Sequence, residues 1–89
     1  MNQGDFLKIL SQDGFPEPVL VIQERSGFLD KHTHPFEVKA LVTHGQIDIV
    51  IDGIKSTYAA GDMFHLQHSQ EHVECYGDNG VQYLASRKV

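Results

Sequence analysis

Apolar and polar residues change their spacing once along this chain, close to its N-terminus. The first apolar group has the spacing of one side of a helix and consists of Phe6, Leu7, Ile9 and Leu10. We expect a short helix that begins near Asp5 and ends before Gly14. Because so short a helix is stable only when it docks, we interpret it as a lid or as a dimer contact.

Beyond residue 18 the pattern is that of β-structure. The apolar run 19–22 predicts a buried strand. Alternating apolar and polar positions predict further strands over 36–43, 46–52, 54–58, 63–66, 72–76 and 81–86. Turns are expected between them at Gly45, at the hairpin signal Asp52-Gly53, at 60–62 and at 77–80. About seven short strands with frequent turns indicate an all-β sandwich or barrel.

The alternation also predicts which side chains face the core. One face of 36–43 carries Phe36, Val38, Ala40 and Val42, and one face of 46–52 carries Ile47, Ile49 and Ile51. Extended back through Pro35, the first of these faces includes His34 and His32. The strand pattern therefore places two histidines on the inner side of the predicted barrel.

Length and charge limit the possible functions. The 89 residues fit a single domain, with a helix and lead-in over 1–17 and a barrel over 18–89. A core this thin would gain from self-association, so we expect a homodimer. The net charge of −5 and the lack of any basic run argue against nucleic-acid binding.

The sequence also lacks the usual marks of a membrane or exported protein. No apolar run approaches the roughly 20 residues that span a bilayer, and the N-terminus has no signal-like segment. Cys75 is the only cysteine, so no internal disulfide forms, and we interpret it as a small buried apolar residue. We expect a cytoplasmic protein without membrane contacts.

Three histidines provide the candidate chemistry. His32 and His34 are two residues apart, a spacing that puts both imidazoles on the same face of an extended segment. His72 can complete a site for a divalent transition metal, with coordination positions left for water or a small ligand. Imidazole ligands bind iron, manganese, nickel and zinc alike. The sequence does not identify the metal, because selection among these metals depends on geometry and supply.

The stretch 27–72 resembles the two-part signature of the cupin superfamily. The matching residues are Gly27, His32, His34, Glu37 and Gly45 for the first part, and Gly61, Asp62 and His72 for the second. The resemblance implies a double-stranded β-helix, or jelly-roll barrel, whose two motifs lie on adjacent strands and meet at a metal in the barrel mouth. It also implies that His32, His34 and His72 are the three histidine ligands.

The chain departs from that signature at two places. The fourth ligand usually follows the second histidine by four or five residues, whereas Val38 stands at four and Glu37 at three. By alternation Glu37 points away from the barrel and Val38 points inward, unless a bulge at Pro35 reverses them. The loop 67–71 keeps the usual length but is more polar.

Other residues near the motifs receive weaker assignments. Glu74 is two residues after His72 and shares its face of the strand. It is a substitute ligand, an acid or base, or a solvated or ion-paired group. Phe36 and Met63 are interpreted as pocket wall. Structural or exposed roles are expected for the remaining candidates, which are Lys39, His44, His65, His68, Tyr76, Tyr83 and Arg87.

The leading hypothesis is therefore a small metal-binding cupin that binds, and in an enzyme transforms, a small carboxylate or carbonyl compound. Isomerase, lyase and dioxygenase chemistry remain open, and no catalytic residue is assigned. The lack of an evident carboxylate ligand disfavours an iron oxygenase with a facial triad. The alternatives are a non-catalytic binding or sensor module that works with a partner, and a metal-free structural cupin.

Overall fold

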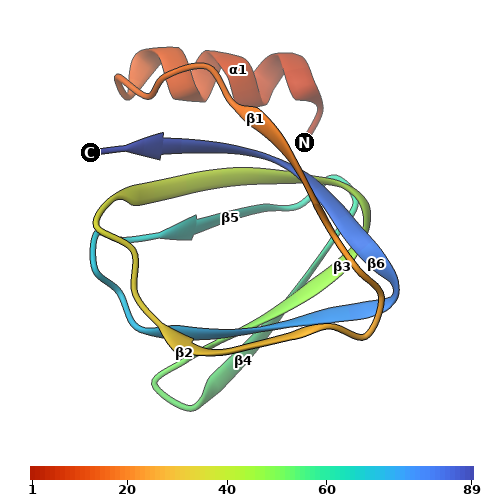
Figure 1. Cartoon of the computed structure of the whole chain (residues 1–89). Coiled ribbons are helices and arrows are strands. Elements are labelled where there is room, and N and C mark those ends of the chain that lie inside the picture. Colours follow the sequence, from red (N-terminus) through yellow and green to blue (C-terminus); the bar gives the residue numbers. More distant parts are fainter.

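One helix and six strands make up the protein, and two of the strands are much longer than the others (Figure 1). The computed structural model describes all residues, 1–89. In chain order the elements are α1 (Gln3–Gln12), β1 (Val19–Gln23), β2 (Phe28–His32), β3 (Glu37–Ile51), β4 (Ile54–Ala59), β5 (Met63–Leu66) and β6 (His72–Lys88).

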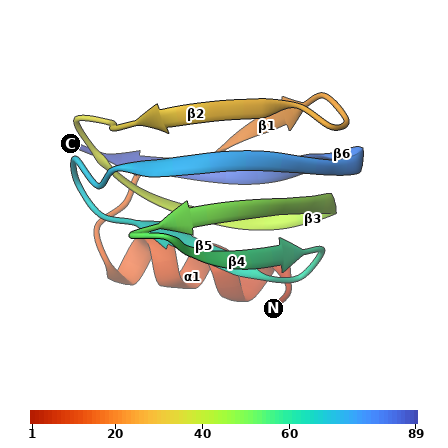
Figure 2. The ribbon, with the colours of Figure 1, turned by 90° about the horizontal axis from the view of Figure 1, so that it is seen from below.

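The long strands β3 and β6 pair along their whole length and belong to two layers at once. In one layer the first part of β3 pairs with the last part of β6, between β1 and β5. In the other layer the remaining parts pair between β2 and β4, and the order β2, β6, β3, β4 is visible in Figure 2. All pairs are antiparallel, which confirms the expected all-β jelly-roll barrel with a short N-terminal helix.

The predicted turns at Gly45 and at 77–80 are wrong, because the chain bends there without leaving its strand. Before the bend in β3 the side chains that enter the core between the layers are even-numbered, as at Val42, and after it they are odd-numbered, as at Ile47. The pairing with β6 shifts register at the same place. A shift of one residue exchanges the two faces of a strand, so it allows one strand to line the interior in both layers.

Two glycines make this corner possible. Gly45 and Gly80 have φ angles of 72° and 73°. A Cβ atom on Gly45 would lie only 2.1 Å from the carbonyl oxygen of Gly80, so the two bends are in direct backbone contact. The hairpin predicted at Asp52-Gly53 is confirmed, with both residues at positive φ, as a type I′ turn requires.

The main core lies between the two layers. It contains Val38, Ala40, Val42, Ile47, Ile49, Phe64, Leu66, Val81, Tyr83 and Ala85. The inward faces predicted for the strand segments 36–43 and 46–52 are thus confirmed, with Phe36 and Ile51 packed against this core. Burying these side chains is the main stabilising contribution, at roughly 25 cal/mol per Å² of apolar surface.

The helix packs on the outside of the barrel. Asn2 caps its N-terminus by accepting from the backbone N–H of Asp5 at 2.8 Å. At the other end Gly14 has a φ of 72°, and the N–H of Phe15 bonds to the carbonyl of Leu10 at 2.8 Å, which is a Schellman motif. The predicted helix is confirmed, and it begins at Gln3, two residues before Asp5.

The face of α1 that docks forms a second, smaller core. Phe6 and Leu10 pack there with Phe15 and with Leu41, whose side chain lies on the opposite face of β3 from Val42. This position is away from the histidines, so the interpretation of α1 as a lid is wrong. Met63 packs against the same cluster, so its interpretation as pocket wall is also wrong.

Several apolar side chains remain exposed on the strands β1 and β2. They are Val19, Leu20, Ile22, Phe28 and Leu29, which are 42–63% exposed. Both strands pair on one side only, with β6, so they form an edge of the sheet. The only helix, α1, is too short and too polar to cross a membrane.

Candidate metal centre

Three histidines meet at the end of the barrel where the chain passes between its two layers. His32 is the last residue of β2 and pairs with His72, the first residue of β6. His34 lies in the connection from β2 to β3, which is not a strand. The N–H of Ser69 donates to the carbonyl of His34 at 2.8 Å and ties this connection to the loop before His72.

The predicted convergence is found, but its predicted cause is wrong. His32 and His34 do not share the face of one continuous strand, because β2 ends at His32 and β3 begins at Glu37. Their ring centroids are nevertheless 4.8 Å apart, and the centroid of His72 lies 4.1 Å from that of His32. The connection turns inward as it crosses between the layers, and this turn brings His34 to the other two rings.

Glu74 is the fourth member of the group. It follows His72 by two residues on β6, so its side chain also points into the barrel. One possible ligand atom from each of His32, His34, His72 and Glu74 lies within 4.8 Å of all the others. Glu74 is only 6% exposed, which excludes a solvated group and leaves the roles of metal ligand, acid or base, and ion-pair partner of a histidine.

The imidazoles of His32 and His72 are oriented by backbone carbonyls. The Nδ1 atom of His32 lies 2.7 Å from the carbonyl oxygen of Asp30, and that of His72 lies 2.9 Å from the carbonyl oxygen of Gln70. Since a carbonyl only accepts, each Nδ1 carries the proton and donates. In the neutral imidazole this leaves a lone pair on Nε2 of each ring.

Both of these lone pairs point at the same carboxylate oxygen. Oε2 of Glu74 is 3.1 Å from Nε2 of His32 and 3.0 Å from Nε2 of His72. Three electron-rich atoms in a buried place repel one another unless a positive charge lies between them. That charge is a proton on an imidazole or a metal cation, so the donor set fits a divalent transition metal.

The pKa shifts follow from this arrangement. Burial alone would lower the pKa of His72, but its hydrogen bonds to Glu74 and to the carbonyl of Gln70 raise that pKa above 6.5. Burial opposes ionisation of Glu74, yet its hydrogen bond and charge interaction with His72 lower its pKa below 4.5. Without a metal, the site therefore favours an imidazolium–carboxylate pair.

His34 differs from the other two histidines in being held by aromatic contact. Its ring stacks on Phe36, with centroids 5.0 Å apart and planes 11° apart. Burial, followed by the charges of His32 and His72, lowers the pKa of His34. A histidine that stays neutral keeps a lone pair available for a metal.

Tyr76 supports the carboxylate from the next inward position of β6. Its hydroxyl donates to Oε1 of Glu74 at 3.2 Å. Burial and then the charge of Glu74 raise the pKa of Tyr76, so the hydroxyl keeps its proton. Gly27 makes room for this ring, because a Cβ atom at position 27 would lie 2.7 Å from Cδ2 of Tyr76.

Glu37 lies outside the barrel, as the alternation predicted. Its carboxylate contacts Nε2 of His65 at 2.5 Å on the outer surface. The acidic group at the site therefore comes from the second motif strand, β6, and not from β3. His44 and His68 do not join the donor group, and they contact the hydroxyls of Thr43 and Ser69.

A small cavity adjoins the histidines between the two layers. Its volume is about 50 Å³, and it is lined by His34, Phe36, Val38, Phe64, Leu66, Glu74, Tyr83, Ala85 and Arg87. Phe36 thus contributes to the pocket wall as predicted, and Tyr83 is core. The apolar lining excludes most water from one side of the candidate metal centre.

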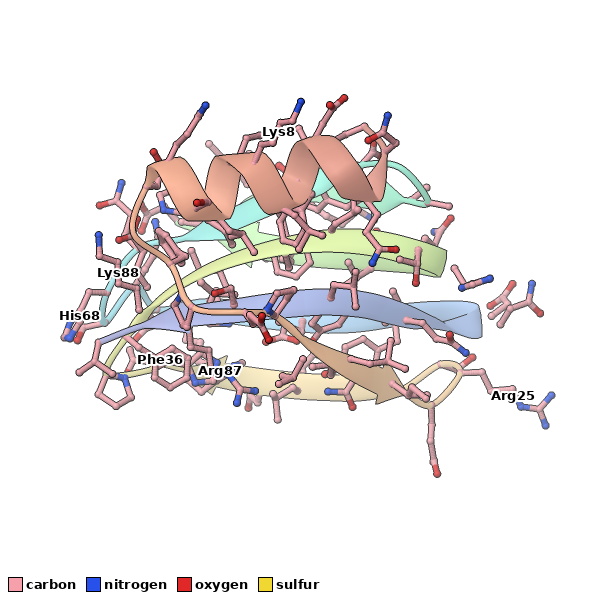
Figure 3. The ribbon with its side chains drawn as sticks, turned by 90° about the horizontal axis from the view of Figure 1, so that it is seen from above. Lys8, Arg25, Phe36, His68, Arg87 and Lys88 are labelled. Carbon is pink, nitrogen blue, oxygen red and sulfur yellow. The ribbon has the colours of Figure 1, made fainter.

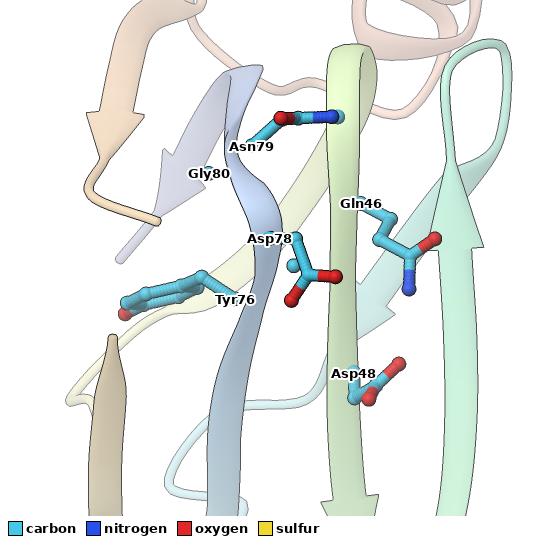
Figure 4. A pocket seen from close by; sticks show the side chains of 8 residues that line it. Gln46, Asp48, Tyr76, Asp78, Asn79 and Gly80 are labelled. Atoms are coloured by element: carbon cyan, nitrogen blue, oxygen red, sulfur yellow. The ribbon is translucent and has the colours of Figure 1, made fainter. Parts of the chain in front are cut away.

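A larger hollow of about 450 Å³ lies at the opposite end of the barrel, along the bends of β3 and β6 (Figure 4). Gln46, Asp48, Asp78 and Asn79 contribute its polar side chains, together with Gly45 and Gly80 of the corner. It contains no histidine, and the two acidic groups belong to exposed or half-exposed residues. Cys75, expected to be buried, is half-buried near this region of β6.

Solved structures share this architecture. A cupin superfamily protein from Desulfitobacterium hafniense aligns with a TM-score of 0.69 and 14% identity, covering 79% of this chain and 63% of its own. An RmlC-like cupin from Shewanella frigidimarina aligns with a TM-score of 0.65 and 19% identity, covering 82% and 68%. A tryptophan-to-tyrosine variant of Bacillus subtilis oxalate decarboxylase aligns with a TM-score of 0.70 and 14% identity, covering 80% and 20%.

These likenesses define the fold as that of a small cupin, which confirms the resemblance seen in the motifs. This chain spans less than two thirds of the length of the Desulfitobacterium protein. No family model matches the sequence, and no curated protein matches it. The fold and the group of three histidines and one glutamate together fit a metal-binding cupin.

Proposed function

We propose that this protein holds one divalent transition metal through His32, His34, His72 and Glu74 and presents it to a small organic ligand in the adjoining cavity. The observation that carries the proposal is the approach of two Nε2 atoms to one carboxylate oxygen, at 3.1 and 3.0 Å. Their Nδ1 atoms donate to carbonyls, so both Nε2 atoms are free to bind a cation.

When bound, such a metal supplies a Lewis acid or an oxygen-binding centre. The residues of the chain do the remaining work. The carbonyls of Asp30 and Gln70 hold two imidazoles in one tautomer, and the hydroxyl of Tyr76 holds the carboxylate of Glu74. The apolar cavity restricts water around a bound ligand.

The inward position of Glu74 favours an enzyme over a passive binding module. A buried carboxylate beside the ligand cavity can bind the metal or exchange a proton with a ligand. The first motif lacks a carboxylate ligand, which counts against an iron oxygenase. Glu74 supplies such a carboxylate from β6. Isomerase, lyase and dioxygenase activities all suit the site, and one neighbour in fold is an oxalate decarboxylase.

Elemental analysis tests the metal site directly. The protein is purified without a metal-affinity tag, incubated with divalent iron, manganese, nickel or zinc, and desalted. We expect about one equivalent of metal in the parent and none in a His32→Ala/His72→Ala double variant. A His44→Ala/His68→Ala double variant is the matched control, since both of its histidines are exposed, and should keep the metal.

A parent free of metal after every incubation would overturn the proposal. Equal metal content in the two double variants would also overturn it, because metal binding would then not depend on His32 and His72.

We also propose that the protein forms a homodimer. The exposed apolar side chains of β1 and β2 lie along an edge of the sheet, which is a surface suited to self-association. Light scattering at several concentrations tests this: a mass of about 20 kDa, twice the 10.0 kDa of one chain, is expected. A mass of one chain throughout would contradict it.

A further inference from the structure

Arg87 is the only charged residue besides Glu74 that lines the cavity beside the candidate metal centre. It lies near the end of β6, opposite Val38 of β3. Val38 points into the barrel, and so do Tyr83 and Ala85, which alternate with Arg87 along β6. The strand register therefore directs Arg87 to the inner face, although its side chain is exposed as the sequence predicted.

The guanidinium of Arg87 has no partner of opposite charge. None of the ion pairs in the protein includes Arg87. The next residue, Lys88, points the other way and donates to the carbonyl of Asp13 beneath the helix. Adjacent cations on β6 thus have different surroundings: the lysine supports the helix, and the arginine is available at the cavity.

An aromatic contact holds Arg87 at the mouth of the cavity. Its Cζ atom lies 5.4 Å from the ring centroid of Phe36, and Figure 3 shows the two side chains together near the end of β6. The same ring also contacts the metal centre, because Phe36 stacks on His34. Phe36 therefore links the guanidinium to the candidate metal ligands through two contacts.

The charges favour an anionic ligand. A divalent cation outweighs the single negative charge of Glu74, and Arg87 adds a further positive charge to the same cavity. A guanidinium presents parallel N–H groups that match the two oxygens of a carboxylate.

The size and lining of the cavity limit the ligand further. A volume of about 50 Å³ accommodates roughly three to five water-sized positions. Six of the nine lining residues are hydrophobic, so the part of the ligand inside the barrel is apolar or very small. These limits fit a short aliphatic acid.

We infer that the ligand is a short aliphatic carboxylate, which Arg87 recognises at the cavity mouth while the metal centre receives the same molecule. This inference rests on the proposed function and names its ligand class. Arg87 is assigned a binding role, as a specificity residue, and no part in holding the metal.

Calorimetry on the zinc-loaded protein tests the inference with propanoate and its neutral isostere propanamide. We expect propanoate to bind the parent at least about tenfold more tightly than propanamide does, because only the acid forms charge-assisted hydrogen bonds. Arg87→Gln should weaken propanoate binding about tenfold or more and leave propanamide unchanged. Arg87→Lys should be intermediate, since it keeps the charge and loses the paired donors.

Arg25→Gln is the matched control. Arg25 is the other arginine of the chain and lies at the opposite end of the molecule from Arg87 (Figure 3), so this variant should bind propanoate as the parent does. The inference is overturned by equal binding of acid and amide, by no binding of propanoate, or by an Arg87→Gln variant that binds propanoate normally.

Zinc content, measured on the same samples, separates failure of the inference from failure of the proposed function. All three arginine variants should hold as much zinc as the parent. One equivalent of zinc without selective propanoate binding contradicts the role of Arg87 alone. A parent that holds neither zinc nor, in the elemental analysis above, iron, manganese or nickel overturns the proposed function, and the inference falls with it.

Discussion

The two ends of the barrel differ in what the sequence must provide. At the corner, Gly45 and Gly80 touch through their backbones, and the requirement is that no side chain be present. At the other end, His72 and Glu74 must bring particular donor atoms into a buried place. The corner is thus a steric requirement of folding, whereas the histidine end is a chemical requirement of binding.

This difference separates two kinds of failure. A change at the corner should prevent the strands from bending into both layers, with loss of the whole barrel. A change among the donors should leave the barrel and remove the metal, because the main core of ten apolar residues does not include them. The predictions below test this separation, beginning with the largest expected effect.

Gly45→Ala is expected to destabilise the protein by about 3 kcal/mol or more. The new Cβ would lie 2.1 Å from the oxygen of Gly80, and alanine is unfavourable at a φ of 72°. Urea denaturation measures the effect.

Gly53→Ala is the matched control for this change. Its φ of 77° is similar, but a Cβ there meets nothing within 4 Å, so it should cost only about 1 kcal/mol. Equal losses of unfolding free energy in the two variants would show that backbone strain, and not the contact between the bends, causes the cost of a side chain at position 45.

Metal removal is expected to have the next largest effect. At a free metal concentration of 100 times Kd, binding stabilises the folded state by about 2.7 kcal/mol, so chelation should lower Tm by roughly 10–20 °C. Differential scanning calorimetry with and without chelator measures this shift. The His32→Ala/His72→Ala variant should show no shift in Tm. A shift of the same size in that variant would show that metal binding does not depend on these histidines.

The chelated protein should gain stability from the His72–Glu74 pair only within a limited pH range. The pKa of His72 is raised above 6.5, so its contribution is complete below 6.5 and is lost as pH rises through the folded pKa. The pKa of Glu74 is lowered below 4.5, so its contribution is complete above 4.5 and is lost as pH falls through the folded pKa.

The Tm difference between the parent and Glu74→Gln, followed over pH in chelator, should therefore be greatest between pH 4.5 and 6.5. This Tm difference should correspond to about 1.5–3 kcal/mol of unfolding free energy, the usual contribution of a charged hydrogen bond. A difference that keeps growing above neutral pH would contradict an imidazolium–carboxylate pair.

Tyr76→Phe is expected to have the smallest effect on folding. It removes the hydroxyl that donates to Glu74 at 3.2 Å and keeps the ring in its place against the core. Metal affinity should fall about tenfold, as for other groups that orient a metal ligand, while the unfolding free energy changes by about 1 kcal/mol or less. Unchanged affinity in a competition titration would show that Glu74 does not need this support.

Much of this comparison could be predicted from the sequence, because alternation reports which face of a strand is buried. Val38, Ala40 and Val42 on one segment and Ile47 and Ile49 on the next were assigned correctly to the core. The change from even to odd positions across Gly45 was also present in the pattern. By itself this change predicts a turn between two strands, since a bulge and a turn both interrupt the period.

The position of α1 and the role of Arg87 could not be predicted in the same way. Helical spacing shows that α1 has an apolar face, but the surface that receives it contains Leu41 and Leu84, which belong to two strands distant in sequence. Likewise, alternation along β6 does not reveal that Arg87 meets Phe36, a residue more than fifty positions earlier.

Local period and the spacing in two short motifs are enough to predict the all-β class, most of the core and the three histidines. They do not reveal that β3 and β6 are continuous through their bends, or that His34 lies in a connection between the layers. Nor do they reveal that Glu74, and not Glu37, lies with the histidines. Such choices depend on contacts between segments distant along the chain, and the local pattern of a sequence does not record them.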